Sequence, residues 1–155
     1  MIYVYNKHID DFSWHKNNYE IGRPYILQNP YTHLELENTK AVYKVKTKKE
    51  AIEKYSHYFD VMYGSNKEFT KVVDEIYEKY KCGEIVYLAC WCKKYSVYDT
   101  NYKKDFENSC HGDVIVDKLR KRLLKEKINL KMAGRLAHDL NERIGDDWDK
   151  ISGKY

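Results

Sequence analysis

EIVYLACW, residues 84–91, is a nearly continuous apolar run that follows a helix-like segment and a turn at Gly83. Runs of this kind, bounded by turn signals, are typical of strands that are buried on both faces of a parallel sheet. We therefore expect residues 84–91 to form the central strand of an α/β domain. In open α/β sheets, ligands bind beyond the carboxyl ends of the strands, and this run places Cys90, Trp91 and Cys92 there.

Two helices are expected before this strand. Thr47 and Glu50 form a capping box, in which each side chain satisfies a free amide of the first helical turn, and Ser65 and Glu68 form a second box. Apolar residues at helical spacing follow both boxes. The second helix would end at Gly83, because glycine is the usual residue just past a helix end.

Two shorter strands are expected near the N-terminus, at residues 2–5 and 19–21, where β-branched and aromatic residues gather. A polar, aromatic loop would join them. The second strand leads into GRP at 22–24, a sharp turn whose proline keeps the preceding arginine out of helical geometry. A further turn at 29–30, with the sequence NP, indicates a structured loop between the two turns.

The segments after the central strand differ in character. Residues 95–109 form a polar, aromatic insertion without a clear period, and a basic helix would then run from His111 to about Lys127. An added C-terminal helix would span residues 131–149, with apolar residues at steps of four: Met132, Leu136, Leu140, Ile144 and Trp148. This order predicts the α/β class, a small sheet with helices packed on it in a Rossmann-like layered single domain over residues 1–155, with an extra C-terminal helix.

Composition narrows the class of protein. The chain has 155 residues, 43% hydrophobic and 34% charged, which suits one globular domain rather than a disordered segment. No apolar run approaches the roughly 18 residues of a membrane span, and the first residues lack the features of an export signal. We therefore expect a cytoplasmic protein without membrane contact, in which the four cysteines are reduced: Cys82, Cys90, Cys92 and Cys110.

The formal net charge of +4 is spread unevenly. Residues 114–135 carry eight basic side chains against two acidic ones, and the segment beyond them is more acidic. A basic helix face attracts phosphates, so a partner protein or nucleic acid is one interpretation. A solvated helix face is the other, and we favour it.

Three interpretations compete for the cysteines near the end of the central strand. The first is a zinc site, although Cys-x-Cys and an adjacent Cys-His pair are unusual spacings for chelation; its ligands would be Cys90, Cys92, Cys110 and His111. The second is nucleophilic catalysis, with candidate residues Cys110, His111 and Asp113. The third, which we favour, makes the cysteines buried walls of a ligand pocket and predicts no cofactor.

Arg23 and the start of the basic helix are the candidate anion-binding features. Arginine forms two-pronged bonds with phosphate, and a helix N-terminus offers free amides. The alternative for Arg23 is a structural role, as a salt bridge or a helix C-cap. The alternative for Asn29 is a hydrogen bond from its side chain to the backbone of its own turn. The other histidines, including His33, show no ligand spacing. The predicted ligand-binding residues are Gly22, Arg23, Pro24, Asn29, Tyr31, Trp91, Cys92, His111, Gly112 and Asp113.

Two signatures in the chain resemble a known family. YEIGRP at 19–24, followed by NPY at 29–31, and LACWC at 88–92, followed by CHGDVI at 110–115, resemble the signatures of the family called domain of unknown function 4326. The resemblance covers roughly residues 1–125. Gln28 stands where the family usually has glycine, and residues 95–109 lengthen the gap between the cysteine signatures, so that we expect this insertion to form a lid or an interface.

The resemblance implies an α/β fold and one site that both signatures share, in proteins common in bacteriophages and bacteria. It implies a location rather than a reaction. We expect a binding protein for a small phosphorylated or nucleotide-derived ligand, such as a phage sponge that sequesters a cyclic-nucleotide or ADP-ribose-type immune signal as an anti-defense device. An enzyme, a hydrolase or transferase acting on a nucleotide or nucleoside, and an interaction protein that uses the basic helix are the alternatives. A homo-oligomer is also expected.

Overall fold

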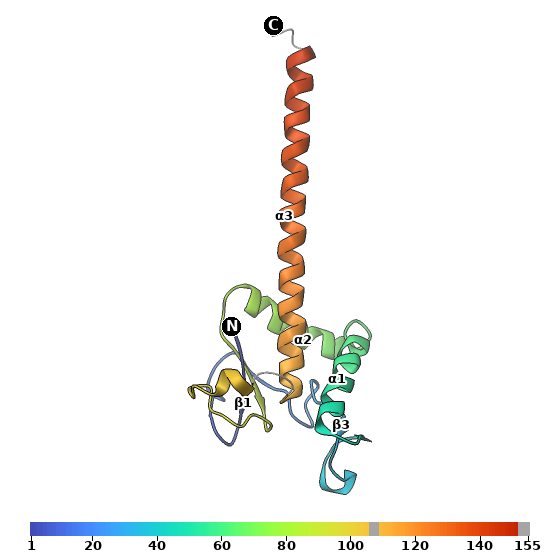
Figure 1. Ribbon diagram of the computed structural model, residues 1–155, viewed down its shortest axis with the longest axis vertical. Helices are drawn as coiled ribbons and strands as arrows, with labels where there is room; N and C mark the ends of the chain where they lie inside the picture. Colours follow the sequence, from blue (N-terminus) through green and yellow to red (C-terminus); the bar gives the residue numbers. More distant parts are fainter. Residues whose placement is uncertain (106–108, 152–155) are drawn as a thin grey trace. The chain divides into compact units, whose positions relative to one another are not determined.

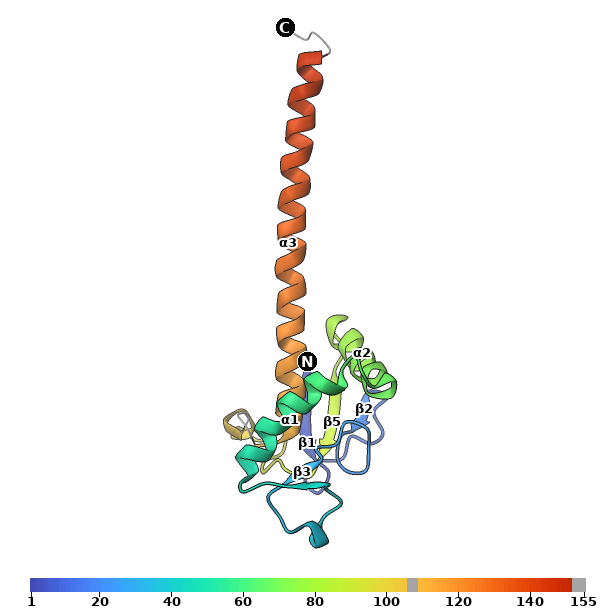
Figure 2. The ribbon, with the colours of Figure 1, turned by 90° about the vertical axis from the view of Figure 1, so that its right-hand side faces the viewer.

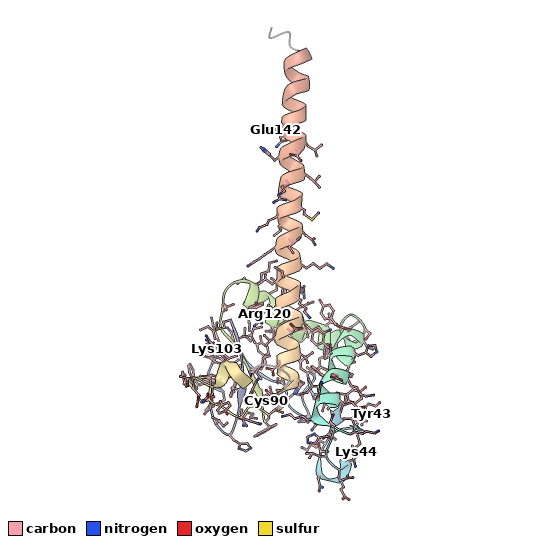
Figure 3. The ribbon with its side chains drawn as sticks, in the orientation of Figure 1. Tyr43, Lys44, Cys90, Lys103, Arg120 and Glu142 are labelled. Carbon is pink, nitrogen blue, oxygen red and sulfur yellow. The ribbon has the colours of Figure 1, made fainter. Side chains whose placement is uncertain are left out.

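The computed structural model describes residues 1–105 and 109–151 of the chain, which forms two compact units (Figure 1). The first unit is Met1–Leu119 and holds the strands and the first two helices. The second unit begins at Arg120, which Figure 3 labels, and continues the last helix.

The first unit is built on a parallel sheet of three strands. Its elements in chain order are β1 (Ile2–Asn6), β2 (Asn18–Glu20), β3 (Tyr31–Thr32), the short 3-10 helix η1 (Leu36–Asn38), β4 (Tyr43–Lys44), α1 (Lys48–Met62), α2 (Lys67–Lys81), β5 (Val86–Cys90) and the 3-10 helix η2 (Tyr102–Asp105). The last helix, α3 (His111–Ile151), begins in this unit.

β5 is the central strand, as the sequence predicts. The strand order is β1-β5-β2, and both neighbours run parallel to β5, so the three strands lie side by side in Figure 2. Leu88 pairs with Val4 on one side and with Tyr19 on the other. The expected α/β class is therefore confirmed. A second, two-stranded parallel ladder of β3 and β4 was not predicted, because each of its strands has only two residues.

The two faces of the sheet are covered differently. On one face, Phe12 from the loop after β1 stacks on Tyr87 with a ring separation of 4.0 Å, and Tyr5 meets the Phe12 ring edge-on. The alternate residues, Val4 and Leu88, are fully buried on the other face, and α2 packs against β5. This second face is a helix-covered core.

The described part of the 95–109 insertion lies along the edge of the sheet. The Tyr102 hydroxyl accepts a hydrogen bond from the Val4 amide at 3.0 Å and donates one to the Val4 carbonyl at 2.9 Å. Ser96 Oγ and the Val97 amide donate to the carboxylate of Asp10. The Tyr102 bonds satisfy free polar groups of the edge strand β1, and the bonds to Asp10 tie the insertion to the loop after β1. Residues 106–108 of the insertion lie outside the described residues.

The helix ends agree with the sequence in part. Thr47 caps α1 and accepts a bond from the Glu50 amide at 3.1 Å. α2 begins one residue later than its capping box predicts, because Asn66 rather than Ser65 is the cap and accepts from the Phe69 amide at 3.0 Å. Gly83, with φ of 83°, ends α2 as expected.

The prediction of two separate helices after His111 is wrong. α3 is continuous from His111 to Ile151, with no break between residues 127 and 131. The segment KINLK at 127–131 contains neither glycine nor proline, so nothing in it ends a helix. The predicted apolar side chains of Ile144 and Trp148 lie outside the described side chains. Among the described residues, none of the helices has the length and apolarity needed to span a membrane.

Gly112 holds the first turn of α3 close to the sheet. A Cβ at this position would lie 2.6 Å from Val4 Cγ1 and 2.9 Å from Ile21 Cδ1. Those distances are too short for any real side chain. The contact explains why a glycine stands at this point of the chain.

We predict that Gly112→Ala lowers the free energy of unfolding by about 1–3 kcal/mol, the usual cost of overpacking a core. Urea unfolding followed by circular dichroism measures it. Gly134→Ala is the matched control, because no atom lies within 4 Å of a Cβ there and alanine favours helix. Equal stability of the Gly112→Ala variant and the wild type would contradict this account of the packing.

Candidate functional site

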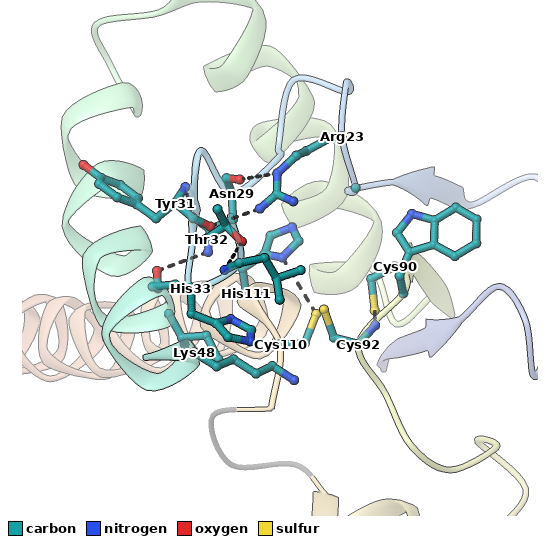
Figure 4. A pocket seen from close by; sticks show the side chains of 15 residues that line it. Arg23, Asn29, Tyr31, Thr32, His33, Lys48, Cys90, Cys92, Cys110 and His111 are labelled. Atoms are coloured by element: carbon teal, nitrogen blue, oxygen red, sulfur yellow. Dashed lines mark hydrogen bonds between the residues drawn. The ribbon is translucent and has the colours of Figure 1, made fainter. Parts of the chain in front are cut away.

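A pocket of about 240 Å³ lies at the carboxyl ends of β2 and β5 (Figure 4). Four segments line it: the loop from Gly22 to Leu34, the start of α1, the end of β5 and the start of α3. Both of the predicted signatures therefore meet in one place. Parallel strands deliver the segments that follow them to the same edge of the sheet, which is why distant parts of the chain converge here.

Arg23 braces the loop that forms one wall of the pocket. Its guanidinium donates three hydrogen bonds: from Nε to the Asn29 carbonyl at 2.9 Å, from Nη1 to Thr39 Oγ1 at 2.9 Å and from Nη2 to the Tyr31 carbonyl at 3.0 Å. Burial lowers its pKa, while the nearby Cys92 raises it. Among the described residues, Arg23 has no carboxylate partner, so the predicted salt bridge is absent.

Asn29 has the structural role that the sequence left open. Its Nδ2 donates to the Ala51 carbonyl at 3.1 Å and its Oδ1 accepts from the Tyr31 amide at 3.0 Å. These bonds tie the loop to α1 and close an Asx turn. Asn29 and Tyr31 both line the pocket, but Asn29 has its two ends engaged.

Three cysteine side chains meet at the base of the pocket. The sulfur atoms of Cys90, Cys92 and Cys110 all lie within 4.8 Å of one another. Cys90 and Cys110 are buried, and Cys92 is partly exposed. Backbone amides point at two of the sulfurs, because the Cys92 amide lies 3.5 Å from Cys90 Sγ and the Gly112 amide lies 3.3 Å from Cys110 Sγ. This cluster could hold a metal ion.

The three thiols do not share one pKa. Hydrogen bonds from Cys110 and Cys90 lower the pKa of Cys92, burial opposes them, and the ammonium of Lys48 lowers it further. The pKa of Cys110 is raised, because it donates to the other two sulfurs and is buried. Of the three thiols, Cys92, on the pocket side, is therefore the one that loses its proton most readily. The buried Cys110 is poorly placed to act as the nucleophile that the sequence suggested.

His111 is the first residue of α3 and is buried beside the cysteines. Its Nε2 lies 2.7 Å from the Ile21 carbonyl oxygen, which can only accept, so Nε2 carries the proton. Burial lowers the pKa of His111, and the ring is accordingly neutral. The unprotonated Nδ1 then faces Cys110 Sγ at 3.8 Å.

Asp113 lies outside the pocket lining and forms a buried ion pair. Lys93 Nζ lies 2.8 Å from Oδ1 and 2.9 Å from Oδ2, and both side chains are almost wholly enclosed. The Ser109 amide also donates to Oδ2 at 3.2 Å. Among the described groups, Oδ1 accepts no well-aligned hydrogen bond, so the Lys93 ammonium alone balances it. Burial raises the pKa of Asp113, against the lowering by Lys93.

Residues 4–121 match the family model described as domain of unknown function, DUF4326. The chain belongs to this family. No curated protein and no solved structure matches the chain. The match includes both signatures and ends close to the point at which the second unit begins.

The structure places most, but not all, of the predicted ligand-binding residues in this pocket. Of the predicted set, Pro24, Gly112 and Asp113 are not part of the lining. Those that line it are Gly22, Arg23, Asn29, Tyr31, Trp91, Cys92 and His111. The insertion of this family member, over its described residues, adds nothing to the lining.

Several pocket residues were not predicted from the DUF4326 signatures. They come from the β3 segment and from the start of α1, which the sequence placed as a capped helix without relating it to the site: Thr32, His33, Leu34, Lys48, Ala51 and Ile52. Lys93 was also missed, although it directly follows the CWC signature. A lone lysine carries no pattern that indicates burial.

Trp91 is a half-exposed aromatic wall. A Cβ on Gly22 would lie 3.1 Å from Trp91 Nε1, so the GRP turn packs tightly against the indole. The ring also contacts His8, with centroids 4.6 Å apart, and the ammonium of Lys7 lies 4.7 Å from its centre. Contacts with Gly22, His8 and Lys7 thus hold the indole in place, and Trp91 is part of the pocket lining.

We predict that Lys93→Met alone lowers the free energy of unfolding by about 3–5 kcal/mol, because it leaves the Asp113 carboxylate buried without a counter-charge. The double variant Lys93→Met/Asp113→Leu should lose clearly less than the sum of the single variants. Chemical denaturation of all four proteins completes the cycle. Additive losses would show that the two side chains do not depend on each other.

Proposed function

We propose that the chain binds a small phosphorylated or nucleotide-derived ligand in the pocket beside Arg23. The observation that carries this is the guanidinium itself. Three of its five N–H groups are engaged by the loop, which fixes its position, and its charge has no carboxylate partner among the described residues. A fixed arginine with free donors suits an anionic oxygen.

Lys48 supports the same interpretation. It is the first residue of α1 and lines the pocket, and in Figure 4 its side chain extends toward the cysteines. Two cationic side chains around one cavity raise the local concentration of anions. His33 adds a polar side chain to the same lining.

The size of the pocket limits what it can enclose. Its volume of about 240 Å³ lies below the roughly 300–1,000 Å³ typical of pockets that surround a drug-sized ligand. We infer that it takes the phosphate and sugar of a nucleotide rather than the whole molecule. The base would then lie toward Trp91, which is half-exposed and offers a face for stacking.

Recovery of a ligand from the protein tests this proposal. Full-length chain is purified from the cytoplasm of its expression host, denatured and filtered, and the released small molecules are identified by mass spectrometry. Titration with cyclic nucleotides and ADP-ribose-type molecules follows. Intact recovery indicates a binding protein or sponge, whereas conversion of the added compound indicates the alternative, a hydrolase or transferase. Failure to bind any member of the panel would count against both.

We predict that Lys48→Met weakens binding of the anionic ligand about tenfold, equivalent to about 1.4 kcal/mol, because it removes one positive charge from the pocket. Lys49→Met is the matched control. Its side chain is exposed, pairs with Glu53 at 3.9 Å and does not line the pocket. Isothermal titration measures both. Equal losses in the two variants would attribute the effect to net charge rather than to the pocket.

Two other expectations stay predictions. Self-association is tested by light scattering of the full chain. Binding of nucleic acid through α3 would show as steep salt dependence with a DNA duplex. Some of its basic residues are already paired, since Lys118 lies 2.9 Å from Asp60 and Arg122 lies 3.5 Å from Glu126. This pairing favours a solvated helix face.

A further inference from the structure

We propose that one zinc ion is bound by four side chains at the base of the pocket: Cys90, Cys92, Cys110 and His111. The inference stands independently of the proposed ligand. It rests on a cluster of three sulfur atoms, on the histidine nitrogen that lies 3.8 Å from one of them, and on the groups that hold these side chains. It also assigns one role, zinc binding, to both the Cys90/Cys92 pair and the Cys110/His111 pair.

The spacing of the sulfur atoms suits a tetrahedral ion. With zinc–sulfur bonds of about 2.3 Å, tetrahedral geometry places sulfur atoms about 3.8 Å apart. The three sulfurs lie within 4.8 Å of one another, so small rotations of the side chains would complete the arrangement. They come from two segments far apart in the sequence, the end of β5 and the start of α3, which the fold brings together.

His111 presents the correct nitrogen for a fourth ligand. Its protonated Nε2 donates to the Ile21 carbonyl at 2.7 Å, which fixes the ring and leaves the lone pair of Nδ1 available. Histidine ligands of metals usually have their second nitrogen held in this way. Nδ1 lies 3.8 Å from Cys110 Sγ, close to the roughly 3.6 Å that a shared tetrahedral zinc requires.

The unusual spacing of the ligands has a structural explanation. Cys110 immediately precedes α3 and His111 is its first residue, so their side chains leave the backbone on the same side of a helix start. Cys90 ends β5 and Cys92 follows after the strand has stopped. In each pair one residue lies at the end of a regular element and the other lies just outside it, so the unusual spacing does not prevent the side chains of a pair from meeting.

Two backbone amides are placed to stabilise the thiolates that a bound zinc ion requires. The Cys92 amide points at Cys90 Sγ, and the Gly112 amide points at Cys110 Sγ. Such N–H groups stabilise negative charge on sulfur. Three thiolates this close would repel one another strongly, and a divalent cation offsets most of that charge. A disulfide, the competing use of these sulfurs, would employ only two of them and leave His111 without a role.

The metal content of the protein tests the proposal. The full chain is expressed without a metal-binding tag in zinc-supplemented medium, and zinc is measured by mass spectrometry. About one zinc per chain is expected. Less than about a tenth of an equivalent would overturn the proposal. So would a zinc-free protein whose mass is short by two hydrogen atoms, because that loss indicates a disulfide.

Variants and spectroscopy identify the ligands. Cys92→Ser, at the partly exposed cysteine, should weaken zinc binding at least tenfold in a chelator competition, whereas Cys82→Ser should not change it. Cys82 is exposed at the end of α2, away from the cluster. If Cys92→Ser does not fold, X-ray absorption of the wild type decides: three sulfurs at about 2.3 Å and one imidazole nitrogen at about 2.0–2.1 Å are expected. Any other sulfur count, or no imidazole, would overturn the assignment.

Discussion

The pairing of β5 with a parallel strand on each side is the constraint on which the rest of the structure depends. Because β5 is central, Leu88 and Ala89, which point to opposite faces, are both fully buried, and Leu88 pairs with Val4 on one side and Tyr19 on the other. The chain leaves β2 and β5 at the same edge of the sheet. The GRP turn and the CWC segment therefore meet, although about 70 residues separate them in the sequence.

The sequence predicted those parts of the fold that have a local signature. The apolar run at 84–91, the cap at Thr47 and the stop at Gly83 each express a physical preference of nearby residues, and all three recur in the structure. The parts that it missed depend on distant contacts. The β3–β4 ladder has two residues per strand, and the lack of a break near Asn129 shows that a change in side-chain pattern does not end a helix.

The candidate site divides in the same way. The resemblance to the family implied that Arg23 and the cysteines share one location, whereas it gave no indication of their partners. Nothing in the sequence around Arg23 indicates that Thr39 accepts a hydrogen bond from its Nη1. Nothing in the sequence around Asp113 indicates that Lys93 is buried against it. Charged residues take buried positions only when the fold supplies a counter-charge, so their roles are decided by tertiary contacts.

The backbone amides at the start of α3 distinguish a metal site from an anion site at the CHGD signature. A helix N-terminus attracts anions through free amides, but here the Gly112 amide is directed at the sulfur of Cys110 and the Asp113 amide at its carbonyl. Because these two amides already donate hydrogen bonds, a phosphate in the pocket would bind to Arg23 and Lys48 instead. In the proposed site, three thiolates and a zinc ion at the base would carry a net negative charge, which the cations of Arg23 and Lys48 would offset where an anion enters. Metal and anion would thus occupy adjacent parts of the pocket, and the charge of one would set the affinity for the other.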